Sequence, residues 1–209
     1  MPNTQRTDGD NTLGRRARKA LAARRAMFDA GLAAFERQPI GLVSVLDITE
    51  AADVAKGVFY LHFRSKDEFI IALWEDVQRT FLDAIRDVLG GVDSVDERLK
   101  RAAGRYAALA RDNPRPARFW LRVNSYLFDE IGQPGQLGLL RQQFLQQLAA
   151  MLAGVTLEEV TERDMQLAGV LDASCWGLIS QASQLGNPSP DPELFVSIIT
   201  GAARAIESA

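Results

Sequence analysis

Apolar side chains recur every three or four residues along most of the chain, the spacing of one face of an α-helix. This pattern predicts helices over residues 17–38, 66–89, 94–112, 115–131, 136–153, 161–185 and 191–208. No stretch alternates between apolar and polar positions over the length of a strand. With two shorter helices between residues 44 and 63, the pattern predicts an all-α fold of about nine helices.

Helix start signals support these ranges. Ser65 and Ser94 each precede a glutamate by three residues, which predicts a capping box at the start of two helices. Asp191 followed by Pro192 predicts the start of the last helix. The glycine pair Gly90-Gly91 predicts the end of the long helix that Ser65 begins.

The pattern after residue 44 predicts a tight turn between two short helices. Ser44 stands three residues before Asp47, a helix-entry pattern, and Asp53 belongs to a residue type that tolerates the left-handed conformation of such a turn. A second helix of about two turns begins at Ala55 or Lys56. Two short helices joined in this way form a helix-turn-helix, whose second helix is built to enter the major groove of DNA.

Composition narrows the classes of protein. The 209 residues are 47% hydrophobic and 24% charged, which suits a soluble protein with a substantial core. Cys175 is the single cysteine and His62 the single histidine, so we expect no intramolecular disulfide, no zinc site and no cofactor. No apolar run is long enough to cross a bilayer or to form a signal peptide, so we expect a cytoplasmic protein without a membrane partner.

Charge is unevenly divided along the chain. Residues 1–66 carry 11 Lys and Arg against 7 Asp and Glu, whereas residues 67–209 carry 13 against 20. The imbalance indicates a basic module that contacts a polyanion, although ordinary surface variation also produces imbalances. Residues 1–14 are predicted to be a disordered tail. The basic cluster that follows them is either a phosphate-contacting arm or a solvated helix face: Arg15, Arg16, Arg18 and Lys19.

The helix-turn-helix carries a resemblance to a known family. Its residues are Phe35, Gly41, Ser44, Val45 and Ile48, and the run AADVAKGVFYLHFRSKDEF from Ala51 to Phe69. This run resembles "AAGVSKGTFYYHFKSKEEL", the usual wording in the TetR (tetracycline-repressor-like) family of bacterial transcription regulators. The motif covers about residues 18–75, and beyond it the likeness is one of length and all-α architecture.

The resemblance implies which residues bind DNA. Phosphates would be bound by Ser44, Tyr60, His62 and Lys66, and the recognition helix would read DNA from Lys56, Gly57 and Val58. For His62 the alternative is a structural ring stacked between aromatic side chains. Phe59 and Phe63 are expected in the core. Asp53, Ala55 and Val58 depart from the family's turn glycine and two hydroxyl residues, which affects the operator sequence more than DNA binding itself.

The resemblance also divides the chain into a DNA-binding domain at 15–66 and a ligand-binding and dimerisation domain at 67–209. The last two helices would form a homodimer interface, which presents two recognition helices to a palindromic operator. Residues that would line a cavity for a small apolar or aromatic effector are Trp74, Phe81, Tyr106, Trp120, Asn124, Phe144, Met151 and Trp176. For each of them taken singly, ordinary core packing is the favoured alternative. Cys175 is expected to be a small buried apolar residue, with a thiol sensor as the alternative.

Three functions compete at this point. The leading hypothesis is a repressor released from its operator by a small effector. The second is a DNA-binding protein of the same fold that takes no small molecule and acts through protein partners or by spreading on DNA. The third, an all-α enzyme, is disfavoured because the sequence has no Ser-His-Asp set, phosphate loop, metal cluster, or carboxylate pair matched with a histidine.

Overall fold

The computed structural model describes residues 14–129, 134–185 and 192–207. Within them the fold is all-α, as predicted, with no strand. The nine α-helices of these residues are α1 (Arg15–Arg37), α2 (Val45–Ala51), α3 (Lys56–His62), α4 (Lys66–Leu89), α5 (Val95–Asp112), α6 (Pro114–Asp129), α7 (Pro134–Ala153), α8 (Glu162–Leu185) and α9 (Pro192–Glu207). Two short 3-10 helices, η1 (Ile40–Leu42) and η2 (Leu157–Glu159), were not predicted.

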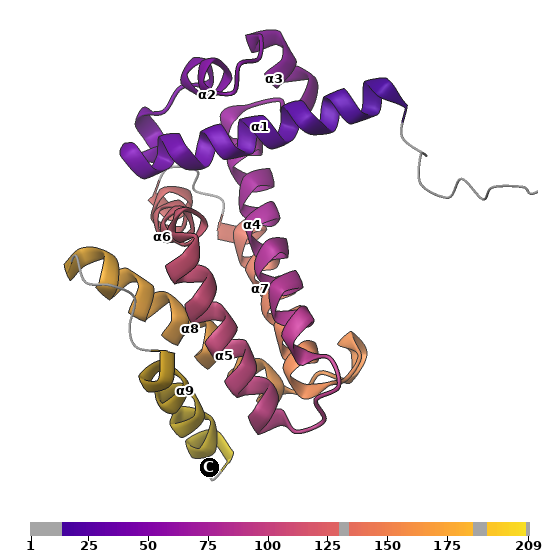
Figure 1. Cartoon of the computed structure of the whole chain (residues 1–209), viewed down its shortest axis with the longest axis vertical. Coiled ribbons are helices and arrows are strands. Elements are labelled where there is room, and N and C mark those ends of the chain that lie inside the picture. The colour runs from indigo at the N-terminus through magenta and orange to yellow at the C-terminus, as the bar shows by residue number, and fades with distance from the viewer. Residues whose placement is uncertain (1–13, 130–133, 186–191, 208–209) are drawn as a thin grey trace, which may run out of the picture.

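The first three helices form a small unit at one end of the molecule. In Figure 1, α1 lies across the top, α2 and α3 lie above it, and α4 descends from beneath it. The helix α2 packs on both α1 and α3. The Asp53 turn between α2 and α3 has the left-handed conformation that the sequence predicts, with φ of 52°.

The long helix α4 joins this unit to the rest of the chain without a break. Its buried face begins with Phe69 and Ile70 near α1 and continues through Trp74, Val77 and Phe81 into the second half of the molecule. The predicted domain boundary at residues 66 and 67 falls in the first turn of this continuous helix. The same helix therefore contributes to the cores of both halves.

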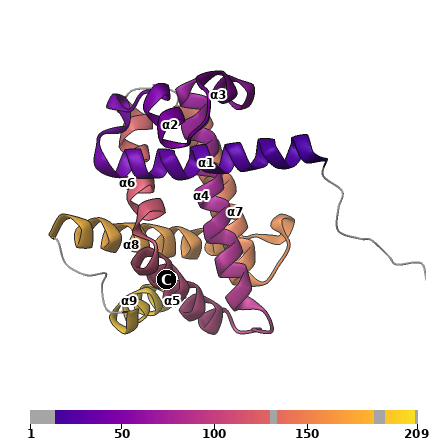
Figure 2. The same ribbon diagram turned by 45° about the horizontal axis from the view of Figure 1, so that its top comes forward.

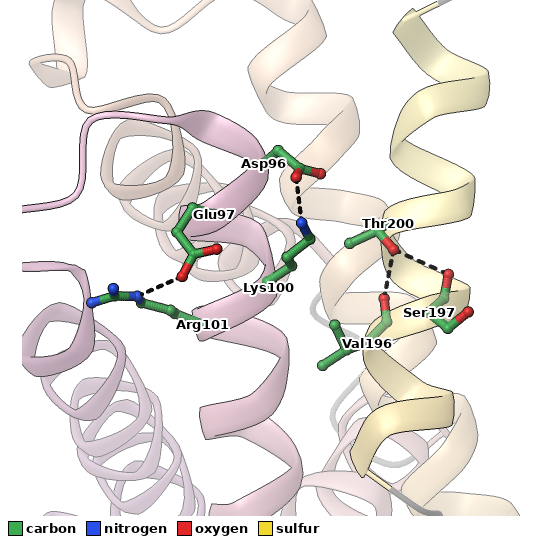
Figure 3. A network of polar contacts seen from close by, with 7 residues as sticks. All are labelled: Asp96, Glu97, Lys100, Arg101, Val196, Ser197 and Thr200. Carbon is green, nitrogen blue, oxygen red and sulfur yellow. Dashed lines mark hydrogen bonds and ion pairs between the residues drawn. The ribbon is translucent and has the colours of Figure 1, made fainter.

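Helices α5 to α9 form the larger body, with α5 packed on α4 and α9, and α7 packed on α8 (Figures 1 and 2). On α5, exposed i to i+4 ion pairs join Asp96 to Lys100 and Glu97 to Arg101 at 2.6 and 3.0 Å. On α9, the hydroxyl of Thr200 donates to backbone carbonyls of its own helix (Figure 3). Such exposed pairs add little stability, so the apolar faces between the helices hold the body together.

Some boundary predictions need correction. The helix predicted from residue 115 begins one residue earlier, because Pro114 occupies the first turn, where a missing N–H costs nothing. The capping box predicted at Ser94 is wrong, since its side chain makes no capping hydrogen bond. At Ser65 half of the box forms: Oγ accepts from the backbone N–H of Glu68, whose carboxylate instead accepts from the N–H of Arg64.

Three predicted features lie wholly or partly outside the described residues: the disordered tail at residues 1–14, of which only residue 14 is described, the end of the helix at 130–131, and the cap at Asp191. Among the described residues, no helix combines the length and the hydropathy needed to cross a membrane.

Candidate functional site

Helix α3 turns one face outward and the opposite face inward. Lys56, Gly57 and Tyr60 are exposed, Tyr60 by 51%, and Tyr60 follows the other two by four and three residues. A Cβ placed at Gly57 would have no neighbouring atom within 4 Å, so this surface is open to a close approach. Val58 is half-buried. Phe59 on the opposite face is fully buried, which confirms its predicted role in the core.

A cluster of phenylalanine rings, termed here the phenylalanine cluster, supports α3 from beneath. Its members are Phe28, Phe35, Phe59, Phe63 and Phe69. Ring centroids of Phe63 and Phe69 lie 5.1 Å apart, edge to face, the geometry that aromatic pairs prefer. Gly31 of α1 permits this packing, because a Cβ there would lie 2.7 Å from Cζ of Phe69.

Ser44 caps α2 through a complete capping box, as the sequence predicts. Its Oγ accepts from the N–H of Asp47 at 3.1 Å, and its own N–H donates to the Asp47 carboxylate at 2.7 Å. The pKa of the Asp47 carboxyl is lowered from its ordinary value, first by the hydrogen bond from the Ser44 backbone N–H and then by the Ser44 side chain. The backbone N–H of Ser44 is therefore engaged by Asp47, and the phosphate contact implied by the resemblance stays a prediction.

The ammonium group of Lys66 lies against the backbone that leads into α2. It donates to the carbonyl oxygens of Ile40, Gly41 and Val43 at 3.2, 3.1 and 3.2 Å. Lys66 thus ties the head of α4 to the end of η1 and orients α2. This structural role is one that the sequence analysis did not identify, and the phosphate contact implied by the resemblance stays a prediction.

The start of α3 carries the expected departures. Ala55 occupies the N-cap and provides no side-chain hydrogen bond, as predicted from its methyl group. His62 ends the helix half-buried, with its ring 6.0 Å from that of Phe63. Leu61, which the sequence analysis did not single out, is 83% exposed. Its signal in the sequence is an apolar residue on the helix face opposite Phe59 and Phe63.

A second aromatic cluster fills the body of the molecule and is termed here the tryptophan cluster. It comprises Trp74, Phe81, Tyr106, Trp120, Phe144 and Trp176, all buried. Trp74 and Trp120 stack at 5.0 Å and 9°, and Trp120 lies 4.8 Å from Trp176. Phe81 stacks on Tyr106 at 5.1 Å. Six of the eight candidate effector residues are thus brought together, packed ring against ring.

The remaining two candidates are Met151 and Asn124. Met151 is half-buried near the end of α7, where its carbonyl accepts from Arg98 at 2.8 Å. The side chain of Asn124 lies outside the described residues. Whether any of the eight contacts an effector stays a prediction.

Asp172 is a buried carboxylate that the sequence analysis missed. It accepts from Trp176 Nε1 at 2.5 Å and, at its second oxygen, from Arg141 at 2.8 Å, with the Tyr106 hydroxyl at 3.5 Å. Burial raises the pKa of Asp172, and these three donors oppose the rise without cancelling it. The available signal was an acidic residue in the middle of an otherwise apolar helix.

Cys175 lies one turn from these groups and is buried, as predicted. Burial raises the pKa of its thiol well above the ordinary value. Little thiolate is therefore present at neutral pH, which disfavours the thiol-sensor alternative. No three His, Cys, Asp or Glu side chains gather as a metal-binding group within the described ranges.

A groove of about 250 Å³ lies between α4 and α7, beside the tryptophan cluster. Its lining is Glu75, Gln78, Arg79, Leu82, Asp83, Arg86, Leu140, Gln143, Phe144 and Gln147. Gln78 and Phe144 belong to the buried wall, and Phe144 is the only one of the eight predicted effector residues in this lining. The sequence signal for Gln78 was a polar residue within the apolar face of α4, one turn after Trp74.

Helix α6 connects the two aromatic clusters. Phe119 stacks on Phe35 of α1 at 5.6 Å, and Trp120 stacks on Trp74. Three arginines of α6 hold the end of α1: Arg115 and Arg118 pair with Glu36 at 2.9 and 2.6 Å, and Arg122 donates to the carbonyls of Phe35 and Gln38. The carbonyl end of a helix carries partial negative charge, so cations stabilise it there.

Two sequence comparisons match the chain to bacterial transcription regulators. Residues 27–73 match the model described as bacterial regulatory proteins, tetR family. Sixty residues are 42% identical to the uncharacterized HTH-type transcriptional regulator YwcC of Bacillus subtilis (strain 168). The match covers 29% of this chain and 27% of that protein, so the chain aligns with about a quarter of the curated relative.

Solved structures extend the likeness over nearly the whole fold. The fatty acid degradation regulator FadR from Bacillus halodurans is 18% identical, with a TM-score of 0.68 over 92% of this chain and 96% of that one. A TetR-family transcriptional regulator from Rhodococcus sp. is 19% identical, with a TM-score of 0.70 over 89% and 98%. At these identities the likeness shows the fold alone.

Proposed function

We propose that this chain, whose residues 27–73 match the tetR family of bacterial regulatory proteins, regulates transcription by binding double-stranded DNA through α3. The observation that carries the proposal is the exposed face of Lys56, Gly57 and Tyr60 on a helix fixed by the phenylalanine cluster. A helix presented in this way fits the major groove, where Lys56 reaches a base edge or a phosphate.

We propose a two-fold homodimer as the binding species. Paired α8 and α9 helices from two copies would form its interface, and two-fold symmetry would place two copies of α3 on successive turns of a palindromic operator. On the side chains described there, Ile198 is 45% exposed and Gly201 is exposed, which supports an apolar contact along α9.

We propose repression relieved by a small, largely apolar effector that binds the body. Helix α4 supports this scheme because its buried face contributes to both aromatic clusters. An effector changes the spacing of the two α3 helices only if it binds one arrangement of α4 and α6 better than another. The name of FadR concerns fatty acid degradation, but at 18% identity it says nothing of this chain's ligand.

The alternative, a regulator that takes no small molecule, has one observation in its favour. The candidate effector residues of the tryptophan cluster pack directly on one another, as Trp74 and Trp120 do at 5.0 Å. The groove between α4 and α7 favours the effector scheme instead.

Selection of bound duplexes from a random pool tests the DNA-binding proposal. We expect a palindrome with half-sites about 34 Å apart, one turn of DNA. Lys56→Ala and Tyr60→Ala should each weaken binding to it, and Tyr60→Phe should reproduce the loss if the hydroxyl binds a phosphate. Lys100→Ala, which removes an exposed lysine of α5 paired with Asp96, is the matched control. Unchanged affinity in both Ala variants of α3 would refute the role of this helix.

A further inference from the structure

Four buried side-chain atoms of the described chain lack a hydrogen-bond partner, and all four are N–H donors: Trp74 Nε1, Gln78 Nε2, Arg105 Nε and Trp120 Nε1. Buried donors are nearly always paired, so a set of one kind indicates a preference for a ligand that supplies acceptors. An indole is a donor only, whereas the amide of Gln78 can turn to present oxygen. The two tryptophans therefore require that the ligand supply a hydrogen-bond acceptor.

One of these donors, Gln78 Nε2, belongs to a residue that lines the groove between α4 and α7, and two more lie behind the groove wall. Gln78 lies in its wall and is 8% exposed. Trp74 precedes Gln78 by one turn of α4 and stacks on Trp120, whose ring lies 6.2 Å from that of Phe144 in the same wall. The two indoles are thus separated from the groove by its wall residues, Trp74 by one turn of α4 from Gln78 and Trp120 by its ring contact with Phe144.

The other residues that line the groove indicate the polarity and charge of the rest of the ligand. Leu82, Leu140 and Phe144 offer apolar contact. Two arginines and two carboxylates, Arg79, Arg86, Glu75 and Asp83, give the lining no net formal charge, and Arg86 pairs with Asp83. A neutral group fits this balance better than an ion does, because the transfer of an ion from water requires a compensating charge.

We propose that this groove is the entrance of the effector site and selects a neutral carbonyl compound, such as an ester, amide or ketone, on an apolar body. The carbonyl oxygen accepts a hydrogen bond from Gln78, with the Trp74 and Trp120 indoles behind it, and the apolar body lies against Leu82, Leu140 and Phe144. This inference rests on the proposed function, since it names the chemical class of its effector.

Three probes with the same chain length test the class: methyl octanoate, octanoate and octylamine. All three tryptophans of the protein lie in the tryptophan cluster, so intrinsic fluorescence of the full-length chain reports binding without a label. We expect methyl octanoate to bind most tightly and protonated octylamine at least tenfold more weakly. Octylamine or octanoate binding as tightly as the ester would overturn the proposal.

Substitution of Gln78 tests the position. Gln78→Leu should weaken methyl octanoate at least tenfold while leaving the melting temperature of the free protein unchanged or higher, because it removes an unpaired buried amide. Gln143→Leu, on the exposed side of the same groove, is the matched control and should change affinity little. Equal affinities of the Gln78→Leu variant and the parent would overturn the proposal.

A second variant provides an independent test in case Gln78→Leu does not fold. Trp120→Phe keeps a ring for stacking and removes the N–H, and it should also weaken the ester, with Trp74 and Trp176 remaining as reporters. Duplex binding measured on the same preparations separates the two proposals. A chain that binds its operator but no ester refutes the effector class alone, whereas one that binds the ester but no duplex refutes the proposed function.

Discussion

The two aromatic clusters differ in whether their side chains carry polar atoms. The phenylalanine cluster beneath α3 is built of side chains without polar atoms, so nothing in it requires a hydrogen bond. The tryptophan cluster contains indole and phenol groups, and while Tyr106 and Trp176 bond to Asp172, Trp74 and Trp120 have no acceptor. The first arrangement suits a rigid support for one surface, whereas the second contains two buried indole donors without an acceptor.

The largest effect is expected from a substitution that disrupts the phenylalanine cluster alone. Phe59→Ala removes a fully buried ring and should cost about 3–5 kcal/mol of stability in the α1–α3 unit. Because every tryptophan lies in the other cluster, fluorescence should still report a folded body while DNA binding and part of the helical circular dichroism are lost. Simultaneous loss of both signals would show that the two cores unfold as one unit.

Lys66→Met tests the polar support of the first region. Losing three charge-assisted donations to the η1 backbone should cost about 2 kcal/mol in chemical denaturation. The salt dependence of DNA binding separates this role from phosphate contact, because each lost contact reduces the slope of log K against log salt by about 0.9. An unchanged midpoint of unfolding would contradict the structural role of Lys66.

A smaller gain is expected at the start of α3. Ala55→Ser supplies the missing N-cap and should stabilise the protein by about 1 kcal/mol. Differential scanning calorimetry would detect a higher melting temperature, and Ala55→Gly, which lacks the hydroxyl, is the control. Equal melting temperatures for the serine and glycine variants would show that the α3 cap does not limit stability.

The smallest effect concerns the pH dependence of the second region. Since burial raises the pKa of Asp172, the folded state retains this proton at a pH where the unfolded state has lost it. Its contribution to stability is complete below the ordinary value of 3.8 and is lost as pH rises through the folded-state pKa. Asp172→Asn should remove this term, so the parent-minus-variant difference in unfolding free energy should fall with rising pH and then level off. A difference that rises over the same range would contradict the raised pKa.

The sequence predicted the helices because they depend on local pattern. Caps, glycines and helical spacing located α1 to α9, and even the left-handed Asp53 turn followed from residue type. The roles of Lys66, Gln78 and Asp172 depend on partners far along the chain. Lys66, for example, binds carbonyls 23 to 26 residues away, which no local spacing specifies. The groove between α4 and α7 likewise could not be predicted, because its lining residues come together only when the two helices pack.

The grip of α6 on the end of α1 has a consequence for protein engineering. Two of its anchors, the carbonyls of Phe35 and Gln38, are backbone groups that any transplanted helix would supply. The other two are the Glu36 carboxylate and the Phe35 ring, which depend on residue identity. A chimaera that gives this body the α1–α3 unit of another protein should therefore keep an acidic residue at position 36 and an aromatic one at position 35. Without them, the new unit will pack poorly against α6.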